Sequence, residues 1–506
     1  MRILTVDIGT TNVKAAIVDE QGRVTRVASR EIPLFSPEPG AAEHSPLAIL
    51  GAVSETSNIV SRNSTVDAVA LSCYQHGLLV VDKEFRPLTN VITHMDWRST
   101  PYVSEIESRA EALELYRRTG CPPLFVYALP KIIWLKSVKR DVSSGHSRFL
   151  LLKDFIIAKA VGEPFIDYGN ASGSQLFNIH SLKWDDLALE LASISEEQLA
   201  EPVEGARVLC ELKGKGAEFF GVKDGTPLVP GTFDGAAQNF GYLLEKTDEG
   251  VLNLGTTAVV RLLSGKIVLD LQSMRTFCYY AASGRWAFGG STNNGGSVLK
   301  WLRDSLGNLE VSAAELLNVN PYELLCKEAE NAPPGSNGLL FIPFMAGERF
   351  PFRDPYSRGV LIGLRYDHRK CHLIRAFLEG VAFTVKALVE AIDRLGFKLV
   401  RLYGSGGGMK SRLWAEIIAN ATGIPIVRVK EGEHASNRGL AALAFTALGS
   451  VRDFHELNWS LEAIDTVEPE PGLAKVYDEA YSRFLEAYRQ LAPLFKKWEE
   501  WKTRIL

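Results

Sequence analysis

Two short stretches of small polar residues are the first candidates for chemistry in this sequence. Gly9-Thr10-Thr11 follows an apolar run, and Gly255-Thr256-Thr257 repeats the pattern about half the chain later. Small residues let a backbone turn approach a phosphate and offer it amide and hydroxyl hydrogen bonds. Asp7 ends the first apolar run, where a carboxylate can hold a hydrated Mg²⁺ beside the phosphates. For one copy alone an ordinary hairpin with a polar tip is the favoured alternative, but two copies predict a pair of hairpins that clamps one polyphosphate.

Asp234 is the candidate for acid–base chemistry. It lies in the segment PGTFDGAAQN, residues 230–239, where small neighbours leave room for a ligand. A carboxylate in such a place can accept a proton from a substrate hydroxyl. The local pattern leaves an alternative open, because an aspartate before a helix is often its N-cap.

A glycine cluster at residues 404–408 follows a predicted strand, Lys398–Tyr403, and precedes a segment with helical character. Met409 stands where a GxGxxG motif would have its last glycine, and the sequence contains no GxxxxGK[ST] loop. The cluster instead offers a flat surface for an adenine, with Ser411 as a polar partner. Close packing of a helix on a strand is the alternative.

Two further strand ends are rich in hydrogen-bonding groups, as a polyhydroxylated ligand requires. Gln75-His76-Gly77 follows one predicted strand and Asp96-Trp97-Arg98-Ser99 follows another. For His76 alone, a histidine satisfied within the core is the alternative. His368 and His372 flank Cys371, but without an HExxH pattern they do not predict a metal site.

The elements that must position these residues alternate between strands and helices, which predicts α/β layers. Strands are expected at Val66–Leu71 and Leu78–Asp82. The expected helices are Ser104–Tyr116, Ile132–Lys139, Asn294–Leu306 and His372–Leu395. The repeated hairpin predicts two related domains, and the aromatic residues spaced from Tyr477 onwards predict a C-terminal helix packed on the body.

Composition excludes several classes of protein. Apolar residues make up 46% of the 506 residues and charged residues 23%, unlike a disordered chain. The net charge of −4 does not suggest a nucleic-acid binder. The six cysteines are scattered without a CxxC pair, and neither a signal peptide nor a membrane span is predicted. We therefore expect a soluble protein of the cytoplasm.

Together these segments resemble the FGGY carbohydrate kinases, a branch of the actin-like ATPase superfamily, over residues 1 to about 450. YALPKIIWL, residues 127–135, is similar to the first family signature, although Ala128 departs from it. SRGVLIGLRYDHRKCHLIRAFLE, residues 357–379, is similar to the second and accounts for His372 without a metal.

The resemblance implies an α/β fold of two actin-like (ribonuclease H-like) domains with a central cleft for ATP and substrate. The implied divisions are residues 1–247 for sugar binding, 248–468 for nucleotide binding and 469–506 for a C-terminal helix. Asp234 matches the catalytic base and a substrate-binding position, and Asp7 matches the position beside Mg²⁺. The matching ATP positions are Gly9, Thr10, Thr11, Gly255, Thr256, Gly296, Gly407 and Ser411. The expected substrate positions are Gln75, His76, Asp96 and Arg98.

Substrate choice follows from finer similarities. Three segments are most similar to gluconate kinases: DGAAQN, GGSTNNGG at 289–296 and Gly347-Glu348-Arg349. One segment, Gln75-His76-Gly77, looks more like xylulose kinases. His94-Met95 and Trp97 depart from both. We expect transfer of the γ-phosphate of ATP to a terminal hydroxyl of gluconate, with Arg98 or Arg349 on its carboxylate unless either is a structural ion pair. The alternatives are a kinase of xylulose, ribulose or another polyol and, more distantly, a nucleotide-driven binding protein. A homodimer is left open.

Overall fold

Both predicted hairpins are present in the computed structural model, which describes residues 1–109, 111–139, 147–244 and 246–505. Strands β1 (Arg2–Ile8) and β2 (Asn12–Asp19) pair antiparallel, with Gly9-Thr10-Thr11 at the bend. Strands β16 (Glu249–Leu254) and β17 (Ala258–Ser264) do the same around Gly255-Thr256-Thr257.

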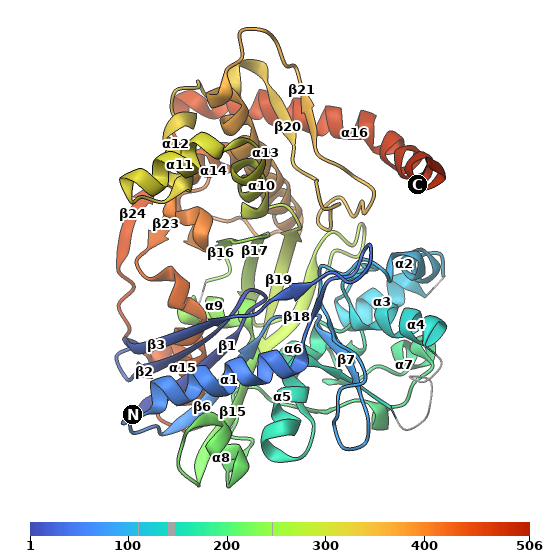
Figure 1. Ribbon diagram of the computed structural model, residues 1–506, viewed down its shortest axis with the longest axis vertical. Helices are drawn as coiled ribbons and strands as arrows, with labels where there is room; N and C mark the ends of the chain where they lie inside the picture. Colours follow the sequence, from blue (N-terminus) through green and yellow to red (C-terminus); the bar gives the residue numbers. More distant parts are fainter. Residues whose placement is uncertain (110, 140–146, 245, 506) are drawn as a thin grey trace. The chain divides into compact units, whose positions relative to one another are not determined.

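The first hairpin belongs to a six-stranded sheet in the order β14-β15-β6-β1-β2-β3. The added strands are β3 (Val24–Glu31), β6 (Ala68–Cys73), β14 (Cys210–Leu212) and β15 (Thr226–Phe233). Strand β6 runs parallel to both β1 and β15, so the carboxyl ends of these three strands share one edge. Strands β1, β2 and β3 run side by side (Figure 1).

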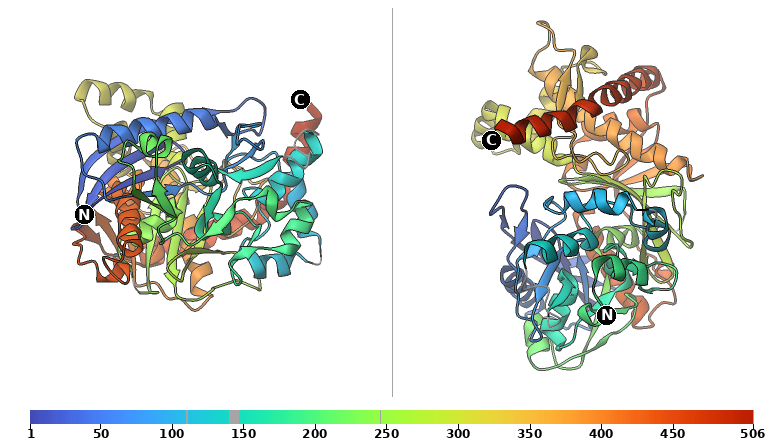
Figure 2. Two further views of the ribbon diagram at one scale, coloured as in Figure 1. Left: turned by 90° about the horizontal axis from the view of Figure 1, so that it is seen from below. Right: turned by 90° about the vertical axis from the view of Figure 1, so that its right-hand side faces the viewer.

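Helices cover both faces of this sheet (Figure 2). Helix α1 (Pro46–Ser61) packs on β2 and β3, while α15 (Ala435–Ala447) packs on β1, β6 and α9 (Asp234–Gly241). Gly439 of α15 is needed at the α9 contact, because a Cβ atom there would lie 1.8 Å from the carbonyl oxygen of Ala237.

A smaller sheet in the order β4-β5-β8-β7-β9 carries the polar strand ends. Its strands are β4 (Leu34–Phe35), β5 (Glu43–His44), β7 (Leu78–Val81), β8 (Val91–Ile92) and β9 (Arg148–Leu151). The other α-helices described in the first 245 residues are α2 (Thr100–Glu107), α3 (Ala112–Thr119), α4 (Ala128–Val138), α5 (Leu152–Val161), α6 (Tyr168–Ser172), α7 (Asp186–Ala192) and α8 (Lys215–Phe220). The single helix expected at Ser104–Tyr116 is wrong, since α2 and α3 are separate. Short pairs β10 (Phe165–Asp167) with β13 (Glu201–Val203), and β11 (Phe177–Asn178) with β12 (Lys183–Trp184), complete this region.

The second sheet repeats the topology of the first: an antiparallel hairpin, β17-β16, followed by parallel strands β22 (Arg401–Ser405) and β23 (Ile426–Val429). Strand β24 (Ala463–Val467) adds antiparallel to β23. The equivalent order in the first sheet is β2-β1-β6-β15. The repeated Gly-Thr-Thr segments therefore belong to a repeat of four sheet strands, and not of one turn alone.

Contacts group the chain into two units that are not contiguous in sequence. The first contains Met1–Glu245, Leu263–Phe288 and His434–Ser460, and the second contains Lys246–Leu262, Gly289–Glu433 and Leu461–Leu506. The sequence division at residue 247 is close to the first crossing. The expected contiguous second domain, 248–468, differs from these units, because α15 buries its apolar residues against the first sheet and β18 (Phe277–Ala282) contacts α6.

The remaining elements include several predicted helices. Those of the second unit are α10 (Gly296–Leu306), α11 (Asn308–Leu317), α12 (Pro321–Ala329), α13 (Lys370–Asp393), α14 (Arg412–Thr422) and α16 (Ala474–Ile505). Strand β19 (Arg285–Thr292) begins in the first unit and ends in the second. Strand β20 (Leu340–Ile342) pairs with β21 (Val360–Ile362). Helix α16 lies against α14 and β20. Among the described helices, none is both long and apolar enough to cross a membrane.

Candidate active site

The shared carboxyl edge of β1, β6 and β15 brings together residues that are far apart in the sequence. In the strand register Asp7 lies opposite Ser72, and Cys73 lies opposite both Ile8 and Phe233. Asp7, the Gln75-His76 segment after β6 and Asp234 after β15 therefore meet at one edge. This is the edge at which ligands bind in open α/β sheets.

Asp7 is a partly exposed carboxylate with a donor beside it. The hydroxyl of Ser72 donates to Asp7 Oδ1. Burial raises the pKa of Asp7, while Ser72 and the positive charges of Lys14 and Lys153 act in the opposite direction. Within the described residues, no group of three or more His, Cys, Asp or Glu side chains forms a metal cage. One carboxylate fits a Mg²⁺ ion that keeps water and phosphate oxygens as most of its ligands.

Asp234 is the first residue of α9, and Phe233 occupies the N-cap position. The alternative of an N-cap aspartate is therefore wrong. The amide of Gly235 donates to Asp234 Oδ1 at 2.7 Å, and the positive end of the helix dipole favours a carboxylate here. Asp234 is only partly buried, as a residue that receives a proton from a ligand must be.

The side chains of Gln75 and His76 are held by the loop around α6. Gln75 Nε2 donates to the carbonyl of Gly169 at 2.9 Å, and His76 Nδ1 donates to that of Gly173 at 2.7 Å. The imidazole of His76 also meets the rings of Tyr127 and Tyr279 edge-on. His76 is buried and hydrogen-bonded, as the alternative of a histidine satisfied within the core requires.

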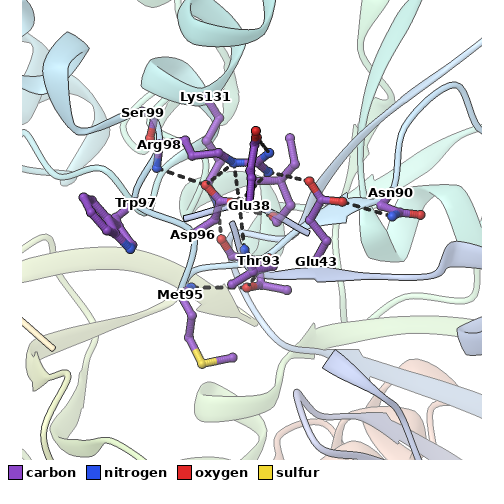
Figure 3. Close-up of polar contacts among 12 residues, drawn as sticks. Glu38, Glu43, Asn90, Thr93, Met95, Asp96, Trp97, Arg98, Ser99 and Lys131 are labelled. Carbon is purple, nitrogen blue, oxygen red and sulfur yellow. Dashed lines mark hydrogen bonds and ion pairs between the residues drawn. The ribbon is translucent and has the colours of Figure 1, made fainter. Parts of the chain in front are cut away.

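Arg98 and Asp96 form a dense ion cluster (Figure 3). Arg98 Nε lies 3.0 Å from Asp96 Oδ2, Nη1 lies 2.6 Å from Glu38 Oε1 and Nη2 lies 2.5 Å from Glu43 Oε1. The guanidinium also lies 4.4 Å from the ring centroid of Trp134. All three nitrogens of Arg98 thus already donate to protein carboxylates, which favours a structural ion pair over a ligand contact. The side chain of Met95 points away from this cluster (Figure 3).

A large pocket of about 870 Å³ lies beside Arg98 and Trp134. Its other walls include Glu38, Glu43 and Leu88. Of the predicted substrate residues it contains Arg98 alone, so we do not assign the sugar to it.

Lys131, which lies in the segment YALPKIIWL, links two of the polar strand ends. Its side chain is fully buried, and Nζ donates to the carbonyls of His76 at 2.7 Å and Thr93 at 2.9 Å. Burial lowers the pKa of Lys131 to about 7, with Asp96 acting against this shift. The lysine therefore ties the segment of Gln75 and His76 to the segment of Asp96.

Lys153 and Asp167 were not predicted as part of the site. They form a fully buried ion pair, with Lys153 Nζ 2.7 Å from Asp167 Oδ2. Lys153 also donates to the carbonyls of Pro230 and Thr232, both at 2.8 Å, just before Asp234. A lysine inside the apolar run FLLLKDFIIA, residues 149–158, was the signal that the sequence offered for Lys153, whereas Asp167 lies outside this run.

The second unit gathers the remaining predicted ATP residues around one pocket of about 590 Å³. Gly255 and Thr256 come from the β16–β17 bend, Gly296 starts α10, and Gly407 and Ser411 precede α14. Gly296 approaches the bend closely, since its amide donates to the carbonyl of Gly255 at 2.6 Å. Ser411 also caps α14, because its hydroxyl accepts from the amide of Trp414 at 3.2 Å.

Sequence reasoning missed one wall of this pocket, which α12 supplies. The wall residues are Asn320, Tyr322, Glu323, Cys326, Lys327 and Glu330. Their spacing of three and four residues is that of one helix face. A pocket of this volume, with glycine backbone on one side and an aromatic ring on the other, fits a nucleotide.

A partly exposed carboxylate at the open edge of the first sheet, a glycine-threonine turn at the same edge and, within the second unit, a nucleotide-sized pocket are typical of one class of enzyme, the phosphotransferases that act on small polyhydroxylated substrates. The model of the FGGY family of carbohydrate kinases matches here, its N-terminal domain over residues 2–241 and its C-terminal domain over 250–448. The chain belongs to this family and is an ATP-dependent carbohydrate kinase with the two-domain fold expected from the sequence.

Three similar proteins illustrate the relationship. A gluconokinase from Bacillus subtilis is 32% identical over 97% of this chain and 96% of its own length. The crystal structures of a gluconate kinase and of a ligand-bound xylulose kinase, both from Lactobacillus acidophilus, each match with a TM-score of 0.89. They are 29% and 28% identical, respectively, and each match covers 98% of this chain and 99% of the other.

Proposed function

We propose that the enzyme transfers the γ-phosphate of ATP to a terminal hydroxyl of gluconate, forming 6-phosphogluconate. The observation that carries the reaction type is Asp234 at the carboxyl edge of the first sheet, beside Asp7 and the Gly9-Thr10-Thr11 turn. The substrate assignment is supported by the similarity to gluconokinases over nearly the whole chain.

In this proposal each group has a defined task. Asp234 orients the attacking hydroxyl and takes its proton, while Gln75 and His76 contribute to the sugar site. The Gly-Thr-Thr turns donate to phosphate oxygens, and the pocket at Gly296, Gly407 and Ser411 holds the nucleoside. Mg²⁺, held by Asp7 through water, would neutralise charge on the phosphates.

Asp234→Asn tests the reaction type, because the amide keeps the shape but cannot take the proton. We expect sugar-dependent ADP release to fall by at least about 1,000-fold, while nucleotide affinity measured by fluorescence titration stays within a factor of about 2. A variant that keeps wild-type turnover would refute the role of Asp234.

A ketopentose such as xylulose is the second candidate substrate, and the contacts of Arg98 favour it. Arg98 is already engaged by three carboxylates, so it does not offer an unoccupied cation to gluconate. A panel of gluconate, xylulose, ribulose and glycerol in the ADP-release assay separates the candidates. Higher kcat/KM for gluconate supports the proposal, and turnover of xylulose or ribulose without gluconate overturns it.

A further inference from the structure

The strand that leads to Asp234 is distorted just before its end. Strand β15 pairs regularly with β6 up to Val229, and the register then shifts before Thr232. Gly231, between them, has φ of +68°, and a Cβ atom there would lie 2.1 Å from the carbonyl oxygen of Leu71. Such bulges re-aim the end of a strand, and here that end is Asp234.

Two backbone carbonyls at the bulge, those of Pro230 and Thr232, accept hydrogen bonds from one side chain. Lys153 Nζ donates to the carbonyls of Pro230 and Thr232 and to Asp167 Oδ2 at 2.8, 2.8 and 2.7 Å. The three protons of the ammonium group therefore have three acceptors. Neither Lys153 nor Asp167 is exposed to solvent, so water cannot replace these hydrogen bonds.

Asp167 extends the same network toward the sugar segment. Its Oδ1 accepts from the amide of Asn170 at 2.9 Å and so caps α6. The carbonyl of Gly169 in α6 in turn accepts from Gln75 Nε2. One buried ion pair thus connects the strand of Asp234 to the helix that holds Gln75.

We propose that Lys153 is a positioning residue that fixes the β15 bulge and so aims Asp234 at the substrate hydroxyl, with Asp167 balancing its charge. This role rests on the proposed function of Asp234. A positioning role differs from a purely stabilising one in what it predicts for activity. Activity should depend on the hydrogen bonds from Lys153 to the two carbonyls, even in a variant that also neutralises Asp167.

The test compares Lys153→Met with the charge-balanced double variant Lys153→Met/Asp167→Asn. The single variant leaves a buried unpaired carboxylate, so its unfolding temperature should fall, and the double variant should recover much of that loss. We expect both variants to lose about 100-fold in kcat, the typical effect of a displaced catalytic group, with nucleotide affinity unchanged. Recovery of wild-type kcat in the double variant would overturn the proposal.

The buried ion pair of Arg375 and Glu379, 3.0 Å apart in the second unit, supplies a matched control. It contacts the carbonyl of Ala332 and the hydroxyl of Tyr477 and none of the proposed site residues. Arg375→Met/Glu379→Gln should lower the unfolding temperature and keep kcat within a factor of about 2. An equal loss of kcat in this control would show that any buried ion pair has the same effect and would overturn the proposal.

A mutant cycle with Asp234→Asn separates failure of this inference from failure of the proposed function. If Lys153 acts through Asp234, adding Lys153→Met to Asp234→Asn should not lower the residual turnover further. A second loss as large as in the wild-type background would overturn the positioning role. An Asp234→Asn variant with full turnover would instead refute the proposed function itself.

Discussion

At the scale of single residues, Arg98 shows how contacts change the interpretation of a residue type. A single arginine near a polar strand end suggests a ligand carboxylate, yet three protein carboxylates surround its guanidinium. Because this planar group has several donors in a fixed arrangement, lysine cannot replace all of its bonds.

Arg98→Lys should therefore lower the free energy of unfolding by about 1–3 kcal/mol, chiefly through hydrogen bonds lost to the buried carboxylate of Asp96. We expect kcat/KM for gluconate and for xylulose to change by the same factor. Denaturant unfolding and the two kinetic assays measure these effects. A selective loss of gluconate turnover would instead show that Arg98 binds the substrate carboxylate.

Lys131 predicts a pH dependence of stability. Its pKa is lowered by burial from 10.5 to about 7, so between these values the unfolded chain holds a proton that the folded chain has released. Stability rises with pH wherever the unfolded state binds more protons, by up to about 1.4 kcal/mol per pH unit for one group. The wild-type protein should thus gain stability relative to Lys131→Met between pH 7 and 9 in denaturant titrations. A stability difference independent of pH would contradict the lowered pKa.

The predictable part of the site consists of residues that follow apolar strands. Asp7 and Gln75 could be singled out because apolar strands end beside them in the sequence, and Asp234 because its neighbours are small. Their meeting at one edge follows only from the parallel pairing of β6 with β1 and β15. Lys131 and Lys153 could not be assigned roles, because their main partners are backbone carbonyls, which carry no residue-type signal. The same holds for the wall on α12, whose residues meet the glycine turns only in three dimensions.

At the scale of elements, the α9–α15 contact holds the helix that begins with Asp234. Gly439→Ala would place a methyl group 1.8 Å from the carbonyl oxygen of Ala237, so the two helices must separate. We expect a loss of about 1–3 kcal/mol in unfolding free energy and a fall in kcat.

Gly51→Ala in α1 is the control for that substitution, because a Cβ atom there meets nothing within 4 Å. It should leave kcat unchanged and stabilise the protein by up to about 1 kcal/mol. Equal effects of the two substitutions in calorimetry and kinetics would contradict the importance of the α9–α15 contact.

Element boundaries were predicted less well than element types. The helical spacing from Ser104 to Tyr116 hides a break, because α2 ends at Glu107 and α3 begins at Ala112. The membership of α15 in the first unit was also not visible, since only tertiary packing assigns an apolar helix to one sheet rather than another.

At the scale of the whole molecule, the residues proposed for the sugar belong to the first unit, and those proposed for the nucleoside belong to the second. Gly407 lines the pocket of about 590 Å³ proposed for the nucleoside, and a Cβ atom there would meet no other protein atom within 4 Å. Gly407→Leu should therefore fold normally, occupy pocket space and raise the KM for ATP by about 10-fold or more, with sugar affinity unchanged in direct binding.

Gly472→Leu offers the matched control for the pocket variant. Gly472 also lies in a short 3₁₀ helix with open space around its Cβ position, but outside the pocket. Its KM for ATP should equal that of the wild-type enzyme. An unchanged KM in Gly407→Leu, with normal folding, would contradict the assignment of the pocket to ATP.

The membership of α15 in the first unit has a consequence for synthesis on the ribosome. Asn437 of α15 donates to Thr5 of the first strand, so these partners emerge at opposite ends of translation. At ~5–20 residues per second, the interval between α9 and α15 is on the order of 10–40 s. Throughout that time the face of the first sheet that α15 covers lacks this helix, so the first unit cannot complete its packing until residue 447 has been made.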